Sequence, residues 1–306
     1  MRELYCLMTK TIDPKEISQQ ELHGLLLTAV APRPICFAST VDAKGNVNLS
    51  PFSYFNVFSS NPPILIFSPA RSGRDNSLKH THQNVKEVPE VVINMVNHAI
   101  VEQMSLSSTA YEKGIDEFIK SGLTAVQSDL ITPPRVGEAP VSFECSVNDI
   151  IELADTPGAG NLIICEVQRI HLNTECMTDG ALRTEKLDLV GRMGGSWYVK
   201  ANGDALFEIP KPIRNQGIGV DALPKGIRES TVLTGNNLGR LGNLETLPSA
   251  DEIAAIAQDD ELRMLAKKVN GNLQKHKNQL HWIAQRTLEE GHTEKAMTIL
   301  LYAENL

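Results

Sequence analysis

Residues 50–63, SPFSYFNVFSSNPP, place hydroxyl, amide and aromatic side chains in one short stretch. Ser50, Ser53 and Asn56 can donate or accept hydrogen bonds, and Phe52 and Tyr54 offer flat apolar faces. Such a combination is typical of a site that holds a flat ligand with polar edges. A half-exposed β-strand shows much the same pattern, so the stretch alone leaves both interpretations open.

The common phosphate-binding and nucleophile motifs are missing from the chain. The sequence contains no GxGxxG, no GxxxxGK[ST] and no GxSxG. The GAG at 158–160 lacks a third glycine and leads into a predicted strand instead of a helix. We therefore do not expect a Rossmann dinucleotide site.

The eight histidines give no metal-binding pattern. His80 and His82 alternate in a polar stretch, and His276, His281 and His292 lie near the C-terminal end. Pairs of this kind bind metal only with further ligands at fixed geometry. Surface histidines are favoured, and we expect no metal.

Composition and charge narrow the class of protein. The chain has 306 residues, 42% hydrophobic and 22% charged, which is ordinary for a globular protein with a buried core. The net charge of −8 argues against a nucleic-acid partner, because phosphate backbones are bound by clustered Lys and Arg. No apolar run of about 18 residues occurs, so no membrane span and no membrane partner are expected.

Cysteine usage favours a reducing compartment. The five cysteines are odd in number and form no CxxC pair, which is typical of reduced thiols and predicts a cytoplasmic protein; they are Cys6, Cys36, Cys145, Cys165 and Cys176. Cys36, Cys145 and Cys165 lie in apolar runs, where core positions are favoured over catalytic ones.

The sequence pattern predicts mainly β-strands with added helices for residues 1–247. Ser18 and Glu21 form a capping box that predicts a helix over 18–29, and APRP at 31–34 ends it. ICFASTV, DAKGN and VNLSPFSYF then predict a hairpin, and further strands are expected at 64–69, 90–96, 141–153 and 161–172, with one helix near 99–109. Without regular strand–helix alternation, these strands predict an antiparallel barrel.

The character of the sequence changes near Pro248. Ser249 and Glu252 form a second capping box, and apolar residues then recur at helical spacing. We expect domains at 1–247 and 248–306, the second a C-terminal extension of three short helices. Its apolar stripes favour packing against the barrel or within a dimer over a partner-binding role.

Several segments in order resemble one known family. APRPICFASTVDAKGNVNLSPFSYFNVFSSNPPILIFSP, KHTHQNV at 79–85, EVVINMV, DEFIKSGLT, PVSFEC and RMGGSWY resemble the flavin reductase-like, FMN-binding split β-barrel family, which includes flavoredoxin-type proteins. GIGVDALPKGIRESTVLTGNNLG at 217–239 resembles the end of its longer members. The resemblance covers about residues 20–247. One position departs from the family, where His80 replaces the usual acid of Lys-Asp-Thr.

The resemblance implies an FMN-binding split β-barrel and a set of cofactor-binding residues. Lys79 and Thr81, with Arg74, would supply charge and hydrogen bonds to the FMN phosphate. The ring edge would be held by Ser39, Thr40, Ser50, Pro51, Phe52 and Ser53. Phe52 or Tyr54 would border the ring face, and strand alternation puts both on one side.

The resemblance also implies an activity. An NAD(P)H-dependent flavin reductase would pass hydride from NADH or NADPH to the flavin, which needs no side-chain acid or base, so no catalytic residue is assigned. The alternative is an FMN-carrying electron-transfer module without nicotinamide activity. His171, late on a predicted strand, fits a core or surface position better than a place beside the site. The family further implies a homodimer and permits a partner oxygenase.

Overall fold

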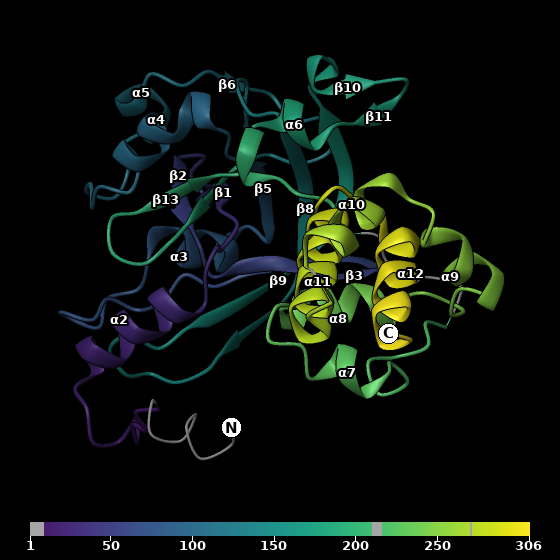
Figure 1. The fold of residues 1–306 in the computed structure, drawn as a ribbon. Coiled ribbons are helices and arrows are strands. Elements are labelled where there is room, and N and C mark those ends of the chain that lie inside the picture. Colours follow the sequence, from purple (N-terminus) through teal and green to yellow (C-terminus); the bar gives the residue numbers. More distant parts are fainter. Residues whose placement is uncertain (1–8, 210–215, 270) are drawn as a thin grey trace. The chain divides into compact units, whose positions relative to one another are not determined.

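The structure is a computed structural model that describes residues 9–209, 216–269 and 271–306. The chain forms two compact units that divide between Phe207 and Glu208, and each is described by itself (Figure 1). The predicted thiol at Cys6 lies outside the described residues.

The first unit is built on one antiparallel sheet of seven strands in the order β2-β1-β5-β8-β9-β4-β3. These strands are β1 (Cys36–Val41), β2 (Val47–Phe52), β3 (Phe55–Ser60), β4 (Pro63–Phe67), β5 (Glu90–Met95), β8 (Val141–Glu152) and β9 (Asn161–Leu172). Three two-stranded sheets accompany it: β6 (Ala125–Val126) with β7 (Arg135–Val136), β10 (Met177–Thr178) with β11 (Ala181–Leu182), and β12 (Val190–Arg192) with β13 (Tyr198–Lys200). The antiparallel pairing expected from the sequence is confirmed.

The helices of this unit are short. They are α2 (Gln19–Ala29), α3 (His80–Glu87), α4 (Val101–Leu106), α5 (Glu117–Ser121) and α6 (Thr184–Leu187), with 3-10 turns η1 (His98–Ile100), η2 (Thr174–Cys176) and η3 (Gly203–Ala205). Ser18 caps α2, and the predicted capping box with Glu21 is present. Among the elements that the sequence pattern did not predict are helix α3 and the separate strand β3.

Strand β1 is buried on both faces and divides the core of the first unit. Its alternate residues enter two clusters, since Cys36 and Ala38 pack with Phe67 and Ile163, whereas Phe37 packs with the cluster around α4 and α5. This follows from the two-residue period of a strand. Cys36, Cys145 and Cys165 are fully buried in the first cluster, as predicted.

The second unit is helical. It contains α7 (Lys225–Arg228), α8 (Gly235–Gly242), α9 (Ala250–Ile256), α10 (Asp260–Lys268), α11 (Leu273–Glu289) and α12 (Thr293–Glu304). Ser249 caps α9 with the predicted capping box. Beyond residue 248 the described residues form four helices where three were expected, and α11 alone has 17 residues.

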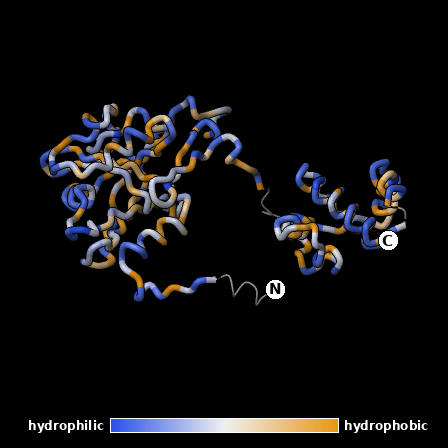
Figure 2. The backbone as a smooth tube through the Cα atoms, turned by 60° about the vertical axis from the view of Figure 1, so that its left-hand side comes forward, coloured by the Kyte–Doolittle hydropathy of each residue, from blue (hydrophilic) through white to orange (hydrophobic). Residues whose placement is uncertain are grey.

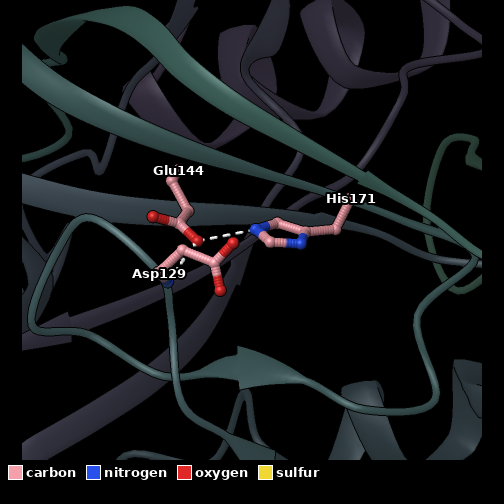
Figure 3. Close-up of side chains that lie close together, drawn as sticks. All are labelled: Asp129, Glu144 and His171. Atoms are coloured by element: carbon pink, nitrogen blue, oxygen red, sulfur yellow. Dashed lines mark hydrogen bonds and ion pairs between the residues drawn. The ribbon is translucent and has the colours of Figure 1, made fainter.

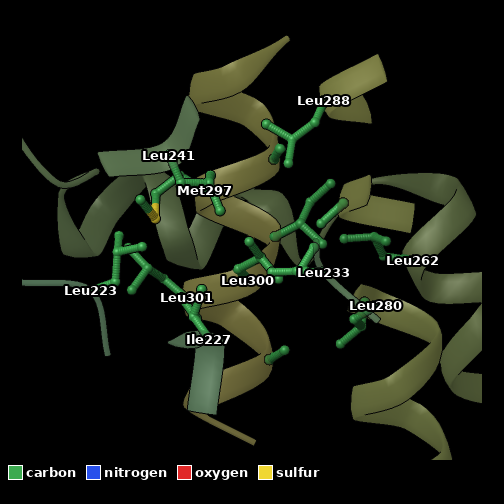
Figure 4. Packing of buried hydrophobic residues seen from close by; sticks show 14 residues of the cluster. Leu223, Ile227, Leu233, Leu241, Leu262, Leu280, Leu288, Met297, Leu300 and Leu301 are labelled. Atoms are coloured by element: carbon green, nitrogen blue, oxygen red, sulfur yellow. The ribbon is translucent and has the colours of Figure 1, made fainter. Parts of the chain in front are cut away.

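One core unites the helices of the second unit (Figure 4). Leu223, Ile227 and Leu241 from before residue 248 pack with Met297 and Leu300 of α12. The compact unit therefore begins at Glu208, whereas the sequence placed a boundary between 247 and 248. A change in composition marks where helices become regular, but shared burial decides which segments fold together.

Hydrophobic and hydrophilic positions alternate at short intervals along the described chain of both units (Figure 2). Among the described residues, no helix has the length and apolar character needed to span a lipid bilayer.

Candidate functional site

A cleft of about 560 Å³ lies in the first unit, and this volume suits a small-molecule site. Five segments line it: helix α2, the end of β2 with the turn that follows, the loop 68–79, Ser108 and Gly158. The lining residues that bear on its chemistry are Gln19, His23, Leu27, Ser50, Pro51, Phe52, Ser53, Tyr54, Ser68, Arg71, Ser72, Arg74 and Lys79.

The floor of the cleft is the break between β2 and β3. Strand β2 ends at Phe52 and β3 begins at Phe55, so the strand alternation expected through Tyr54 does not run through this turn. The Phe52 ring packs on Phe67 with ring centroids 5.5 Å apart and is largely taken up by the core. Tyr54, only partly buried, is the more available of the two aromatic faces.

The loop 68–79 is fixed to the loop before β9. Ser68 Oγ accepts from the Asn161 N–H at 3.0 Å, and the Asn161 side chain donates to the Pro69 carbonyl at 2.8 Å. The Asn76 side chain donates to the Asp155 carbonyl at 2.7 Å. These cross-links hold one wall of the cleft in place without a regular element.

Three cationic side chains, Arg71, Arg74 and Lys79, line this wall. Lys79 is the N-cap of α3 and makes no side-chain capping bond, and the N-terminus of a helix favours anions. Arg71 is mostly buried, and its Nε has no partner among the described residues. This donor set fits a phosphate group.

Glu152 forms an ion pair with Arg71. Its carboxylate lies 3.8 Å from Arg71 Nη2, contacts Lys86 Nζ and lies 3.4 Å from the buried His82 ring. Hydrogen bonding and charge from Lys86 lower the pKa of Glu152, whereas burial lowers the pKa of His82. At neutral pH Arg71, which lines the cleft, therefore also lies beside an ionised carboxylate.

Helix α2 forms another wall. A Cβ atom on Gly158 would lie 2.5 Å from Gln19 Nε2, so the glycine lets the Gln19 side chain approach this loop. At the other end of the helix, the buried Arg33 donates from Nη1 to the Leu27 and Val30 carbonyls. Its Nε donates to Ser53 Oγ at 3.3 Å, which joins this wall to the floor.

Six of the nine cofactor-binding residues expected from the sequence line the cleft, namely Ser50, Pro51, Phe52, Ser53, Arg74 and Lys79. The other three are buried outside its lining. Thr81 Oγ1 accepts from the Asn48 side chain at 2.9 Å, and Thr40 Oγ1 accepts from the Asn84 side chain at 3.2 Å. Ser39 Oγ has no partner among the described residues. A direct contact of these nine residues with a cofactor stays a prediction.

The sequence pattern missed Arg71 and the residues of α2. The run ARSGR at 70–74 places two arginines around Ser72 and Gly73 and was a usable signal for Arg71. Gln19, His23 and Leu27 carried no such signal, because only tertiary structure brings them to the cleft. His80, where the family has an acid, lies outside the cleft lining, in a small pocket beside Asp42 and Lys113.

His171 lies away from the cleft lining, in a cluster with Glu144 and Asp129 (Figure 3). Their side-chain ligand atoms lie within 4.8 Å of one another, close enough for a metal ion. However, Glu144 already accepts from His171 Nε2 at 2.6 Å and from the N–H groups of Asp129 and Leu130 at 2.7 and 2.8 Å. Asp129 pairs with Arg169 at 2.7 Å. We assign the cluster to holding the 129–130 loop on the β8–β9 hairpin.

Comparison with known proteins gives consistent matches. The family described as flavin reductase like domain matches residues 29–184. An uncharacterized protein of Aquifex aeolicus is 35% identical over 196 residues, which are 64% of this chain and 97% of that protein.

Two solved structures extend the comparison to the fold. Nitrilotriacetate monooxygenase component B from Bacillus cereus matches with a TM-score of 0.62 at 29% identity, covering 66% of this chain and 98% of its own. A split-barrel protein from Shewanella frigidimarina matches with a TM-score of 0.56 at 24% identity, covering 66% of this chain and 100% of its own. The split-barrel fold expected from the sequence, followed by helices, is confirmed.

Glu144→Gln should destabilise the first unit. Burial opposes ionisation, but the N–H groups of Asp129 and Leu130 and the His171 ring outweigh it and lower the pKa of Glu144. Losing these charged hydrogen bonds should cost about 1.5–3 kcal/mol of unfolding free energy at pH 7. Urea denaturation would measure it, with the exposed Glu175→Gln as control.

The same substitution has an expected pH dependence. Because the folded pKa of Glu144 is lowered, its stabilisation is present above the unfolded pKa of about 4.3 and is lost as the pH falls through the folded value. The difference between the wild type and Glu144→Gln should therefore shrink in acid. A difference that stays constant from pH 7 to pH 3 would contradict this role.

Proposed function

Since the chain belongs to the flavin reductase-like domain family, we propose that it binds FMN in the cleft of the first unit and acts as an NAD(P)H-dependent flavin reductase. The observation that carries the proposal is the combination, in one cleft, of three cationic side chains, one of them the N-cap of α3, with hydroxyls and an aromatic face. FMN has the matching parts, namely a phosphate, a hydroxyl-rich chain and a flat ring with polar edges.

The phosphate would bind at the wall formed by Arg71, Arg74 and Lys79. The unpartnered, buried Nε of Arg71 supports this assignment, because a buried N–H donor without an acceptor is costly. Guanidinium and ammonium groups give strong charge-assisted hydrogen bonds to phosphate. The ionised Glu152 behind Arg71 would limit its freedom to move.

The flavin ring would lie over the floor between Ser50 and Tyr54. Ser50 and Ser53 offer hydroxyls for the ring edge, and Tyr54 and Leu27 offer apolar surface from the floor and from α2. When bound, FMN would supply the ring that takes up hydride from nicotinamide. The protein's part is to orient the two rings and to exclude water, so we assign no catalytic acid or base.

The comparisons support a role in supplying reduced flavin to a separate enzyme. The Bacillus cereus structure is named as component B of a monooxygenase, and it matches at 29% identity over nearly all of its length. We propose by this analogy that reduced flavin serves a partner oxygenase. The four described cysteines are free and buried, which fits the expected cytoplasmic compartment.

Holoprotein mixed with NADH or NADPH in the absence of oxygen should lose the visible absorbance of its flavin, because hydride transfer reduces the ring. Stopped-flow absorbance would measure the rate with each nicotinamide, and dithionite would give the fully reduced end point. If dithionite bleaches the flavin and neither nicotinamide does so, the reductase proposal fails and the electron-transfer alternative stands.

Lys79→Ala should weaken FMN far more than riboflavin, because only FMN carries the phosphate. We expect a loss of about 1.5–3 kcal/mol in FMN binding, as for a charge-assisted contact. Fluorescence titration of both ligands would measure it. Lys44→Ala, an exposed lysine outside the cleft lining, serves as control. An equal loss for both ligands would move Lys79 away from the phosphate.

We also propose a homodimer formed by the first unit. Strand β3 is an edge of the seven-stranded sheet and exposes Val57 and Phe58 by 62% and 64%, and exposed apolar edges favour association. Light scattering should give about twice the 33.6 kDa of the chain. A chain ending at Phe207 should also be dimeric, and a folded monomer of that length would assign the interface to the second unit.

A further inference from the structure

We propose that Arg33 is a positioning residue of the flavin cleft, because its guanidinium joins the wall formed by α2 to the floor at Ser53. The inference rests on the proposed flavin site and adds to it a residue that does not line the cleft. It assigns the placement of α2 against the floor of the cleft to one buried side chain.

The Arg33 guanidinium donates hydrogen bonds to three segments that are far apart in the sequence. Nη1 donates to the Leu27 carbonyl and, at 2.6 Å, to the Val30 carbonyl. Nη2 donates to the Met193 carbonyl at 3.1 Å, and Nε donates to Ser53 Oγ at 3.3 Å. Only 6% of the residue is exposed, so water competes little for these bonds.

Two of these acceptors belong to residues that line the cleft. Leu27 projects from α2, and Ser53 lies in the turn after β2. A shift of the guanidinium would move both. Lysine cannot replace this arrangement, because an ammonium group lacks the planar fork that reaches several acceptors at once.

Helix α2 has little else to hold it. None of its side chains is buried, whereas most helices in proteins are stabilised by packing an apolar face. Its capping box with Ser18 and Glu21 is local to the helix. Gln19 lies against the Gly158 loop at one end of the helix. At the other end the helix lies against the turn after β12, where a Cβ on Gly194 would lie 2.4 Å from Thr28 Oγ1 and 3.0 Å from Thr28 Cα.

Hydrogen exchange and flavin titration on the full chain test the proposal together. Arg33→Lys should speed exchange of the α2 amides, residues 19–29, roughly tenfold or more in the protein without added ligand, and leave β1 and β5 unchanged. FMN binding should weaken by a similar factor. Ser53→Ala should also weaken FMN, and the double variant should lose less than the sum of the two single losses.

The matched control is Arg192→Lys. Arg192 pairs with Arg33 through the backbone, but its side chain donates to the Trp197 carbonyl and stacks on Tyr198. It should change neither α2 exchange nor FMN affinity. If Arg33→Lys does not fold, Gly194→Ala takes its place, since the added methyl must push the last turn of α2 away.

The outcomes separate this inference from the proposed function. A wild type that binds no FMN would overturn the flavin site. Hydrogen exchange of the α2 amides in Arg33→Lys would still show whether Arg33 holds this helix. Unchanged α2 exchange in Arg33→Lys, or in Gly194→Ala where it is the substitute, would overturn the inference. So would faster α2 exchange with unchanged FMN affinity, or exchange that rises equally in β1 and β5.

Discussion

A buried guanidinium that donates to carbonyls of separate segments is hard to move, because each lost acceptor leaves a desolvated polar group behind. Arg33 imposes this constraint on the first unit. The end of α2, the turn after β12 and the floor of the cleft all meet at its side chain. Arg33 thus joins α2, which buries no side chain in the core, to the rest of the first unit.

The sheet could be read from the sequence because its signal is local and periodic. Strand β1 shows a short, mostly apolar run in place of alternation, since every residue is buried and alternate side chains enter different clusters. The hydropathy pattern did not predict helix α3, because the inner face of this helix is polar, with Thr81, His82 and Asn84 buried against the strands. Hydropathy finds helices whose buried face is apolar, and α3 lacks such a face.

The residues of the candidate site were also only partly predictable from the sequence. Ser50, Ser53 and Lys79 fall in motifs that resemble the family, and all three line the cleft. Thr40 and Thr81 fall in the same motifs but take part in the buried polar contacts that attach α3 to the strands. A motif records which residue types recur, and it does not distinguish those that face a ligand from those that support the residues facing it. The residues of α2 that line the cleft could be identified only from the structure, because no sequence pattern in residues 19–27 indicates contact with residues 50–79.

The distribution of sulfur gives the molecule an internal reporter. All five cysteines precede residue 207, and the four described ones are buried. Burial raises the pKa of the Cys145 thiol to about 12 and also raises the pKa of Cys36 and Cys165, so these thiols are poor nucleophiles in the folded state. A thiol reagent can modify Cys36, Cys145 and Cys165 only when the barrel core opens. The second unit has no cysteine, and the two tryptophans are divided between the units, Trp197 in the first and the half-exposed Trp282 in the second. In a Trp197→Phe variant, thiol labelling would therefore follow the opening of the first unit and tryptophan fluorescence that of the second.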